Sequence, residues 1–187
     1  MYPCSRTTRI AIGFGLAGLM LATRFHHFGD ALHLPDASWA IFFLAGFYLP
    51  VDWLWGLMSL AVGIDYASIH WGGVAAYCIT SAYVFLIPAY AALWAGGYWS
   101  ASRHSLDGRG AARLLLTATL VIGLAFVVSN ASFYWLGGRI ADLSLATFAD
   151  QFLRYFPRYL GINLLYLSMA ALAHVLSVQY LQARQRA

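Results

Sequence analysis

The chain has 187 residues, of which 61% are hydrophobic and only 10% are charged, and its mean hydropathy is +0.68. A soluble domain carries about 25% charged residues, so this composition excludes a mostly water-exposed surface and predicts an all-α integral membrane protein in a lipid bilayer. The net charge of +4 is scattered along the chain without a basic run, so nucleic acid is not expected as a partner.

Hydropathy along the chain predicts six transmembrane helices, because a crossing needs about 20 largely apolar residues. They are expected over residues 9–25, 37–50, 53–72, 80–99, 113–136 and 157–181. The polar sequence after the first one offers no small-residue cleavage site, so this run is interpreted as a helix and not as a signal peptide. Pro50 marks a tight turn between the second and third helices. No repeat or linker is found, and residues 1–187 are predicted to form a single transmembrane domain.

The distribution of arginine orients this bundle by the positive-inside rule. With the N-terminus in the cytoplasm, seven arginines are cytoplasmic and four are external, which favours both termini inside and requires an even number of helices. The cytoplasmic set is Arg6, Arg9, Arg103, Arg109, Arg113, Arg184 and Arg186, and the external set is Arg24, Arg139, Arg154 and Arg158.

Cys78 is the one soft ligand inside the membrane part of the chain. A thiolate is a nucleophile and a metal ligand, and its softness suits cobalt, copper or iron better than calcium or magnesium. A free cysteine is also a small buried hydrophobe in many proteins, so the residue by itself leaves both readings open.

Two adjacent histidines, His26 and His27, lie in the polar loop after the first helix and are candidate pocket residues. They point to different faces of any helix and cannot form an i, i+4 chelate there. Histidine pairs elsewhere in the chain leave open a haem or quinone protein with two axial imidazoles.

Asp65 and Tyr66 lie in an otherwise apolar stretch. A carboxylate in such a place must face water, a partner or a ligand, and a simple position at the membrane interface is the alternative. Tyr77 and Tyr83 could line a pocket for a large flat ligand or belong to the aromatic belts that membrane proteins carry at both interfaces.

The chain contains no Walker motif, no HExxH and no GxSxG sequence, so it is not expected to hydrolyse ATP itself. Small residues four apart in the first helix, Gly13/Ala17 and Gly18/Ala22, permit close helix approach. They serve either packing within the chain or docking of a partner subunit.

Three segments of the sequence resemble the BtuM family of small bacterial cobalamin transporters. They are 24–29 (RFHHFG), 34–40 (LPDASWA) and 42–49 (FFLAGFYL), and the lone Cys78 fits the same family. The resemblance implies a six-helix bundle similar to the S-components of energy-coupling factor (ECF) vitamin transporters, located in the bacterial inner membrane. It implies cobalamin as the transported substrate and either a shared ECF-type energising module or no such module as partner.

By the same resemblance, Cys78 ligates the cobalt of cobalamin and assists decyanation of cyanocobalamin, a catalytic role coupled to transport. The expected cobalamin-binding residues are Cys78, His26, His27, Asp65, Tyr66, Tyr77 and Tyr83. Three other functions remain open at this point: a haem or quinone redox protein with two histidine ligands, an S-component for another vitamin, and a structural subunit without a ligand.

Overall fold

The computed structural model describes residues 5–24, 34–73, 76, 79–140 and 143–186. Within these residues the chain is all helical, with no strand, which confirms the all-α part of the predicted fold class. The elements are α1 (Arg6–Arg24), α2 (Ser38–Tyr48), α3 (Asp52–His70), the 3-10 helix η2 (Ser81–Phe85), α4 (Leu86–Ser102), α5 (Gly108–Leu136) and α6 (Leu145–Arg186).

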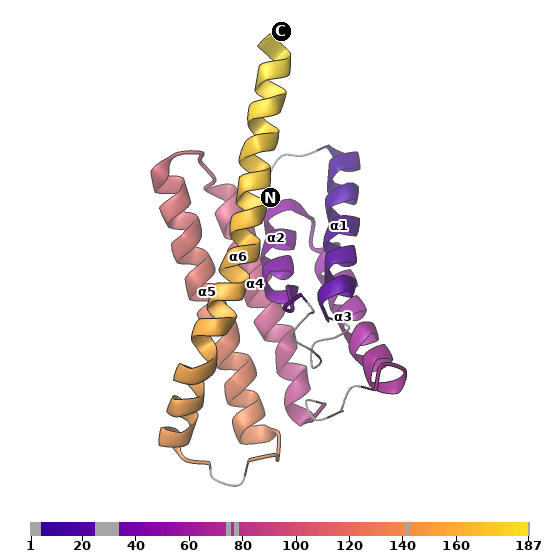
Figure 1. Cartoon of the computed structure of the whole chain (residues 1–187), viewed down its shortest axis with the longest axis vertical. Coiled ribbons are helices and arrows are strands. Elements are labelled where there is room, and N and C mark those ends of the chain that lie inside the picture. The colour runs from indigo at the N-terminus through magenta and orange to yellow at the C-terminus, as the bar shows by residue number, and fades with distance from the viewer. Residues whose placement is uncertain (1–4, 25–33, 74–75, 77–78, 141–142, 187) are drawn as a thin grey trace.

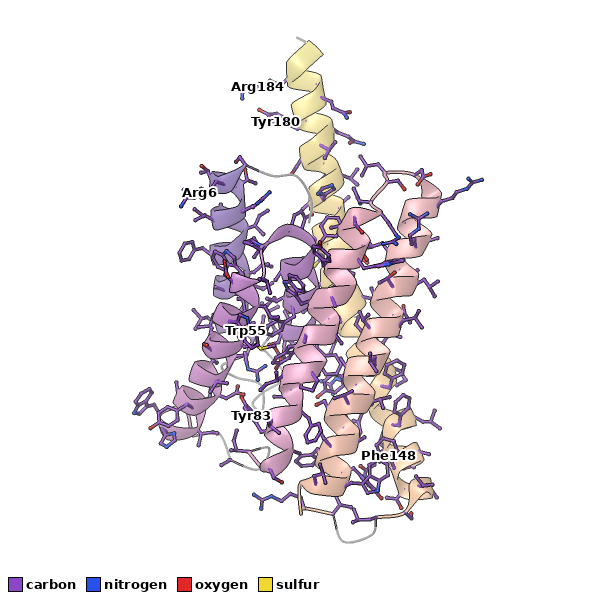
Figure 2. All side chains as sticks on the ribbon, turned by 180° about the vertical axis from the view of Figure 1, so that it is seen from behind. Arg6, Trp55, Tyr83, Phe148, Tyr180 and Arg184 are labelled. Carbon is purple, nitrogen blue, oxygen red and sulfur yellow. The ribbon has the colours of Figure 1, made fainter. Side chains whose placement is uncertain are left out.

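Successive α-helices run in alternating directions, so the bundle has two distinct ends (Figure 1). The terminal end is where α1 begins, α4 meets α5 and α6 ends. The far end is where α1 ends, α2 begins and η2 precedes α4. Figure 2 shows Arg6 and Arg184 toward the terminal end and Tyr83 toward the far end. The start of α1 and the end of α6 therefore lie on the same side of the bundle.

The short helix α2 forms the centre of the bundle. It is apolar on all sides and buried from Trp39 to Phe43, which is the pattern of a helix enclosed by other helices. It contacts α1, α3, α4 and α6. Its 11 residues span only about 16 Å, so α2 by itself is too short to cross a hydrocarbon core of about 30 Å, unlike the crossing predicted for residues 37–50.

Two glycines let α2 and α4 touch through their backbones. A Cβ atom on Gly46 would clash with the carbonyl oxygen of Trp94, and one on Gly97 would clash with that of Phe43. Only residues without a side chain permit this approach. The contact fixes the second half of α2 against the central part of α4.

Two helices, α5 and α6, are long and apolar enough to cross a membrane. Only 22% of the apolar window of α5 and 6% of that of α6 are buried inside the protein, whereas the core helix of a soluble protein is mostly buried. Their exposed apolar side chains include Leu116, Leu120, Leu124, Leu165, Met169 and Leu172. Two such helices with exposed apolar surfaces suggest a membrane protein.

Helix boundaries differ from the predicted ones mainly in α6, which begins at Leu145 and continues through Pro157. A helix start near Pro157 is therefore wrong. Proline inside a helix removes one hydrogen bond, but the first turns of α6 pack aromatic rings onto α5. The ring centroids of Phe148 and Trp135 lie 4.7 Å apart, and those of Phe152 and Phe126 lie 5.1 Å apart. This packing offsets the cost of the proline.

The small residues of α1 face two different surroundings. A Cβ atom on Gly13 would clash with the ring of Trp53 in α3, so this glycine permits packing within the chain. Gly18 faces open space. The prediction of close packing is confirmed for Gly13, and docking of a partner on α1 stays a prediction.

Candidate functional site

A cluster of polar side chains from five parts of the chain meets at the far end of the bundle. We call it the Arg24 cluster. Its members are Arg24 at the end of α1, Asp36 and Ser38 at the start of α2, Asp65 in α3, Tyr83 in η2 and Tyr90 in α4. Five elements far apart in sequence therefore contribute to one polar site in an otherwise apolar core.

Arg24 is the centre of this cluster and is only 7% exposed. Its Nε donates to Oδ1 of Asp65 at 2.7 Å, and its Nη2 donates to Oδ2 of the same carboxylate at 2.7 Å. Two parallel hydrogen bonds between a guanidinium and a carboxylate give both strength and a fixed orientation. The pair therefore links the end of α1 rigidly to α3.

The remaining guanidinium nitrogen connects Arg24 to α2 and α4. Nη1 donates to the hydroxyl oxygen of Ser38 at 3.0 Å and to that of Tyr90 at 2.9 Å. It also lies 3.6 Å from Oδ2 of Asp36, whose Oδ1 accepts from the Ser38 hydroxyl at 2.5 Å. A buried guanidinium with these acceptors is fully compensated, which explains how a charge is retained inside the bundle.

The outer side of the cluster consists of Asp65, Asp36 and Tyr83. The side chains of Asp65 and Asp36 are 20% and 15% exposed, and Tyr83 is half-buried. The phenol of Tyr83 donates to Oδ2 of Asp65 at 2.6 Å. Since the cluster holds two carboxylates and one guanidinium, its formal charge is negative. Acceptor oxygens and a phenol thus lie where a molecule arriving at the far end can reach them.

The inner side of the cluster is locked by aromatic packing. Tyr90 is 4% exposed, and its ring stacks on Phe42 with centroids 4.0 Å apart and planes 14° apart. Stacking of this kind adds to burial in holding the ring. The tyrosine hydroxyl is therefore fixed opposite Arg24 before any ligand arrives.

Of the predicted site residues, the structure brings Asp65 and Tyr83 together. Tyr66 is 56% exposed on the outer surface of α3, where its ring stacks on His70 with centroids 3.9 Å apart, and it makes no contact with the cluster that the structure records. Cys78, His26, His27 and Tyr77 lie outside the described residues. Among the described residues, no group of three or more His, Cys, Asp or Glu side chains is placed to hold a metal ion.

Sequence reasoning missed Arg24 as the partner of Asp65, together with Ser38 and Tyr90. A carboxylate in an apolar helix requires a partner, and Arg24 is the charged residue that ends the first apolar run. These two observations together indicate that Arg24 and Asp65 are paired. The two hydroxyl partners carry no comparable signal, because serine and tyrosine occur throughout the chain.

A second polar hollow lies beside the cluster at the far end, between the end of α5 and the start of α6. Its volume is about 300 Å³, and its polar lining includes Asn130, Tyr134, Gln151 and Tyr155. Amide and phenol groups both donate and accept hydrogen bonds. The far end therefore offers neutral hydrogen-bonding groups as well as the charged cluster.

Comparison of the sequence with protein-family models and with curated proteins gives no match.

Proposed function

We propose that the chain is a multi-pass protein of the bacterial inner membrane that captures cobalamin at the far end of its bundle and releases it into the cytoplasm. The observation that carries this proposal is the Arg24 cluster, a preorganised polar site at one end of a helical bundle with apolar outer surfaces. Such a site suits a polar molecule that cannot cross a bilayer unaided.

The groups of the cluster suit the periphery of a corrin. Cobalamin carries many carboxamide side chains, whose N–H groups need acceptors and whose carbonyl oxygens need donors. Asp65 offers carboxylate oxygens and is held in place by Arg24, and Tyr83 offers a phenol that is held in place by Asp65. Groups that are fixed before binding lose little conformational entropy when the ligand arrives.

In this proposal Cys78 ligates the cobalt of cobalamin. It precedes Tyr83 by five residues, and His26 and His27 follow Arg24 by two and three residues. The segments that carry the predicted ligands are thus joined in sequence to two members of the cluster. A thiolate is a suitable axial ligand for cobalt. Decyanation of cyanocobalamin, in which the thiolate assists reduction of the cobalt by an external reductant and cyanide leaves, is proposed as a coupled activity.

The energy source in this proposal is either a shared energising module or substrate trapping without one. The chain has no ATP-binding motif of its own. The face of α1 at Gly18 is open and permits close approach of a partner helix.

The proposal is tested by the visible spectrum of the purified, detergent-solubilised protein after incubation with cyanocobalamin and removal of free corrin. We expect retained corrin with a shifted spectrum, and loss of the shift in Cys78→Ala. Tyr83→Phe and Tyr66→Phe form a matched pair at the far end, because both remove one phenol oxygen. Tyr83→Phe is expected to weaken binding by about tenfold and Tyr66→Phe to leave it unchanged. Absence of retained corrin in the unmodified protein refutes the proposal.

A further inference from the structure

A cavity of about 350 Å³ lies at the terminal end of the bundle, remote from the Arg24 cluster. It is enclosed by the end of α2, the connection between α4 and α5, the first turns of α5 and the second half of α6. Its volume lies at the lower end of the range found for small-molecule sites in proteins. We call it the terminal cavity.

One part of the terminal cavity is polar, with Tyr48, His104 and His174 contributed by α2, the α4–α5 connection and α6. The hydroxyl of Tyr48 and Nδ1 of His174 are hydrogen-bonded at 2.8 Å. The two imidazole rings lie 5.1 Å apart between centroids with perpendicular planes. Phe47 lies edge-on to His104, with ring centroids 5.3 Å apart. Three elements thus bring two imidazoles, a phenol and an apolar ring to one place.

The rest of the lining is apolar and continues to the outer surface. In the interior the cavity is lined by Ala118 and Leu167. Toward the outer surface it is lined by Leu115 of α5 and Val175 of α6, which are 56% and 36% exposed. These two helices are the ones long and apolar enough to cross a membrane. The cavity therefore adjoins the surface that faces lipid, and a ligand dissolved in the bilayer can enter between α5 and α6.

The electrostatics of the terminal cavity favour a neutral ligand. Among the described residues no arginine lines it, and its carboxylate, Asp107, is engaged in capping α5, where it accepts from the amide of Gly110 at 2.8 Å and from the hydroxyl of Ser105 at 2.7 Å. Burial lowers the pKa of His104 below its ordinary value, so this imidazole is neutral at neutral pH. An anionic headgroup such as a phosphate would find no cationic partner here.

We propose that the terminal cavity binds a neutral, membrane-soluble quinone. The ring lies against Phe47 and the two imidazoles on the cavity side of these three packed rings, and its carbonyl oxygens accept hydrogen bonds at the polar part of the cavity. Tyr48, His104 and His174 line this part and carry the O–H and N–H groups from which a carbonyl oxygen accepts hydrogen bonds. The isoprenoid chain of the quinone follows the apolar lining toward Leu115 and Val175.

The proposal is tested by titrating the full chain in detergent micelles with menadione and with 2,3-dimethylnaphthalene, which has a similar ring system but no carbonyl group. Binding is followed by equilibrium dialysis against empty micelles. We expect saturable binding of menadione with a dissociation constant at least about tenfold below that of the hydrocarbon. Ala171→Phe, which places a ring in the cavity lining, and His174→Leu, which removes an imidazole, are each expected to weaken menadione binding by about tenfold or more.

Tyr83→Phe is the matched control, because it removes a phenol oxygen at the far end and is expected to leave menadione binding unchanged. Cyanocobalamin binding by Ala171→Phe is expected to equal that of the unmodified chain. Failure of the quinone site is therefore distinguished from failure of cobalamin binding. Ala171→Phe keeps every polar group of the site and serves as the second variant should His174→Leu fail to fold. Equal binding of menadione and the hydrocarbon, equal binding of menadione by Ala171→Phe, or a copurifying phospholipid that menadione does not displace overturns the proposal.

Discussion

Removing both members of the ion pair between Arg24 and Asp65 is expected to destabilise the protein no more than removing either one alone. Their side chains are 8% and 20% exposed and are joined by two hydrogen bonds of 2.7 Å. Removing one member of a buried pair costs about 3–5 kcal/mol, mainly because the other charge stays buried. In Arg24→Met the carboxylate of Asp65 keeps Tyr83, and in Asp65→Leu the guanidinium keeps Asp36, Ser38 and Tyr90. Each single variant should therefore lower the free energy of unfolding by about 3 kcal/mol, the lower limit of this range.

The double variant Arg24→Met/Asp65→Leu leaves neither charge of the pair behind. Its cost is expected to be close to that of one single variant, which corresponds to a coupling energy of at least about 2 kcal/mol. The free energy of unfolding is measured for all four proteins by titrating folded protein in mixed micelles with SDS. The emission of the seven tryptophans reports the transition. If the two single costs add to the double cost within about 0.5 kcal/mol, the pair is not coupled and the reasoning is refuted.

Three further predictions concern stability. Asn163→Leu should lower the free energy of unfolding by about 1–3 kcal/mol in the same SDS titration, because the Asn163 amide oxygen accepts from a buried backbone N–H at the start of α2 at 2.9 Å. Gly97→Ala should abolish monodisperse elution, because its Cβ atom would clash with the carbonyl of Phe43, whereas Gly18→Ala, in open space, should elute as the unmodified protein does. Burial lowers the pKa of His104 from its ordinary 6.5, so the unfolded chain binds the proton first and stability should fall as the pH drops below about 6.5. Melting curves between about pH 8 and pH 5 should show this fall in the unmodified protein and a flatter dependence in His104→Gln.

Composition and hydropathy were sufficient to predict an all-helical chain, because apolar runs separated by polar loops reflect the need to satisfy backbone hydrogen bonds inside each segment. The boundaries were less predictable. Pro157 marked a helix start by local rules, yet α6 begins at Leu145. What decides that boundary is the contact of Phe148 and Phe152 with α5, which joins residues far apart in sequence. No local pattern records such a contact.

The polar contacts, like the helix boundaries, were only partly predictable from the sequence. Asp65 was predicted to face water, a partner or a ligand, because a carboxylate in an apolar helix is costly by itself. The identity of the partner depends on which helix ends meet, and Arg24 lies 41 residues away. In the same way, His174 is hydrogen-bonded to Tyr48, 126 residues away. Sequence therefore predicts which groups need partners, and the arrangement of the helices supplies them.

The two polar sites at opposite ends of the bundle depend on one apolar helix. Ser38, the first residue of α2, accepts from Arg24, and Tyr48, the last residue of α2, is bonded to His174. Between them the backbone of α2 is pressed against α4 at Gly46 and Gly97, so the helix cannot slide along its axis without a clash. Closely packed helices can occupy a few discrete positions but cannot be displaced gradually. The position of α2 therefore fixes the geometry of the Arg24 cluster and of the terminal cavity together, although the two sites share no side chain.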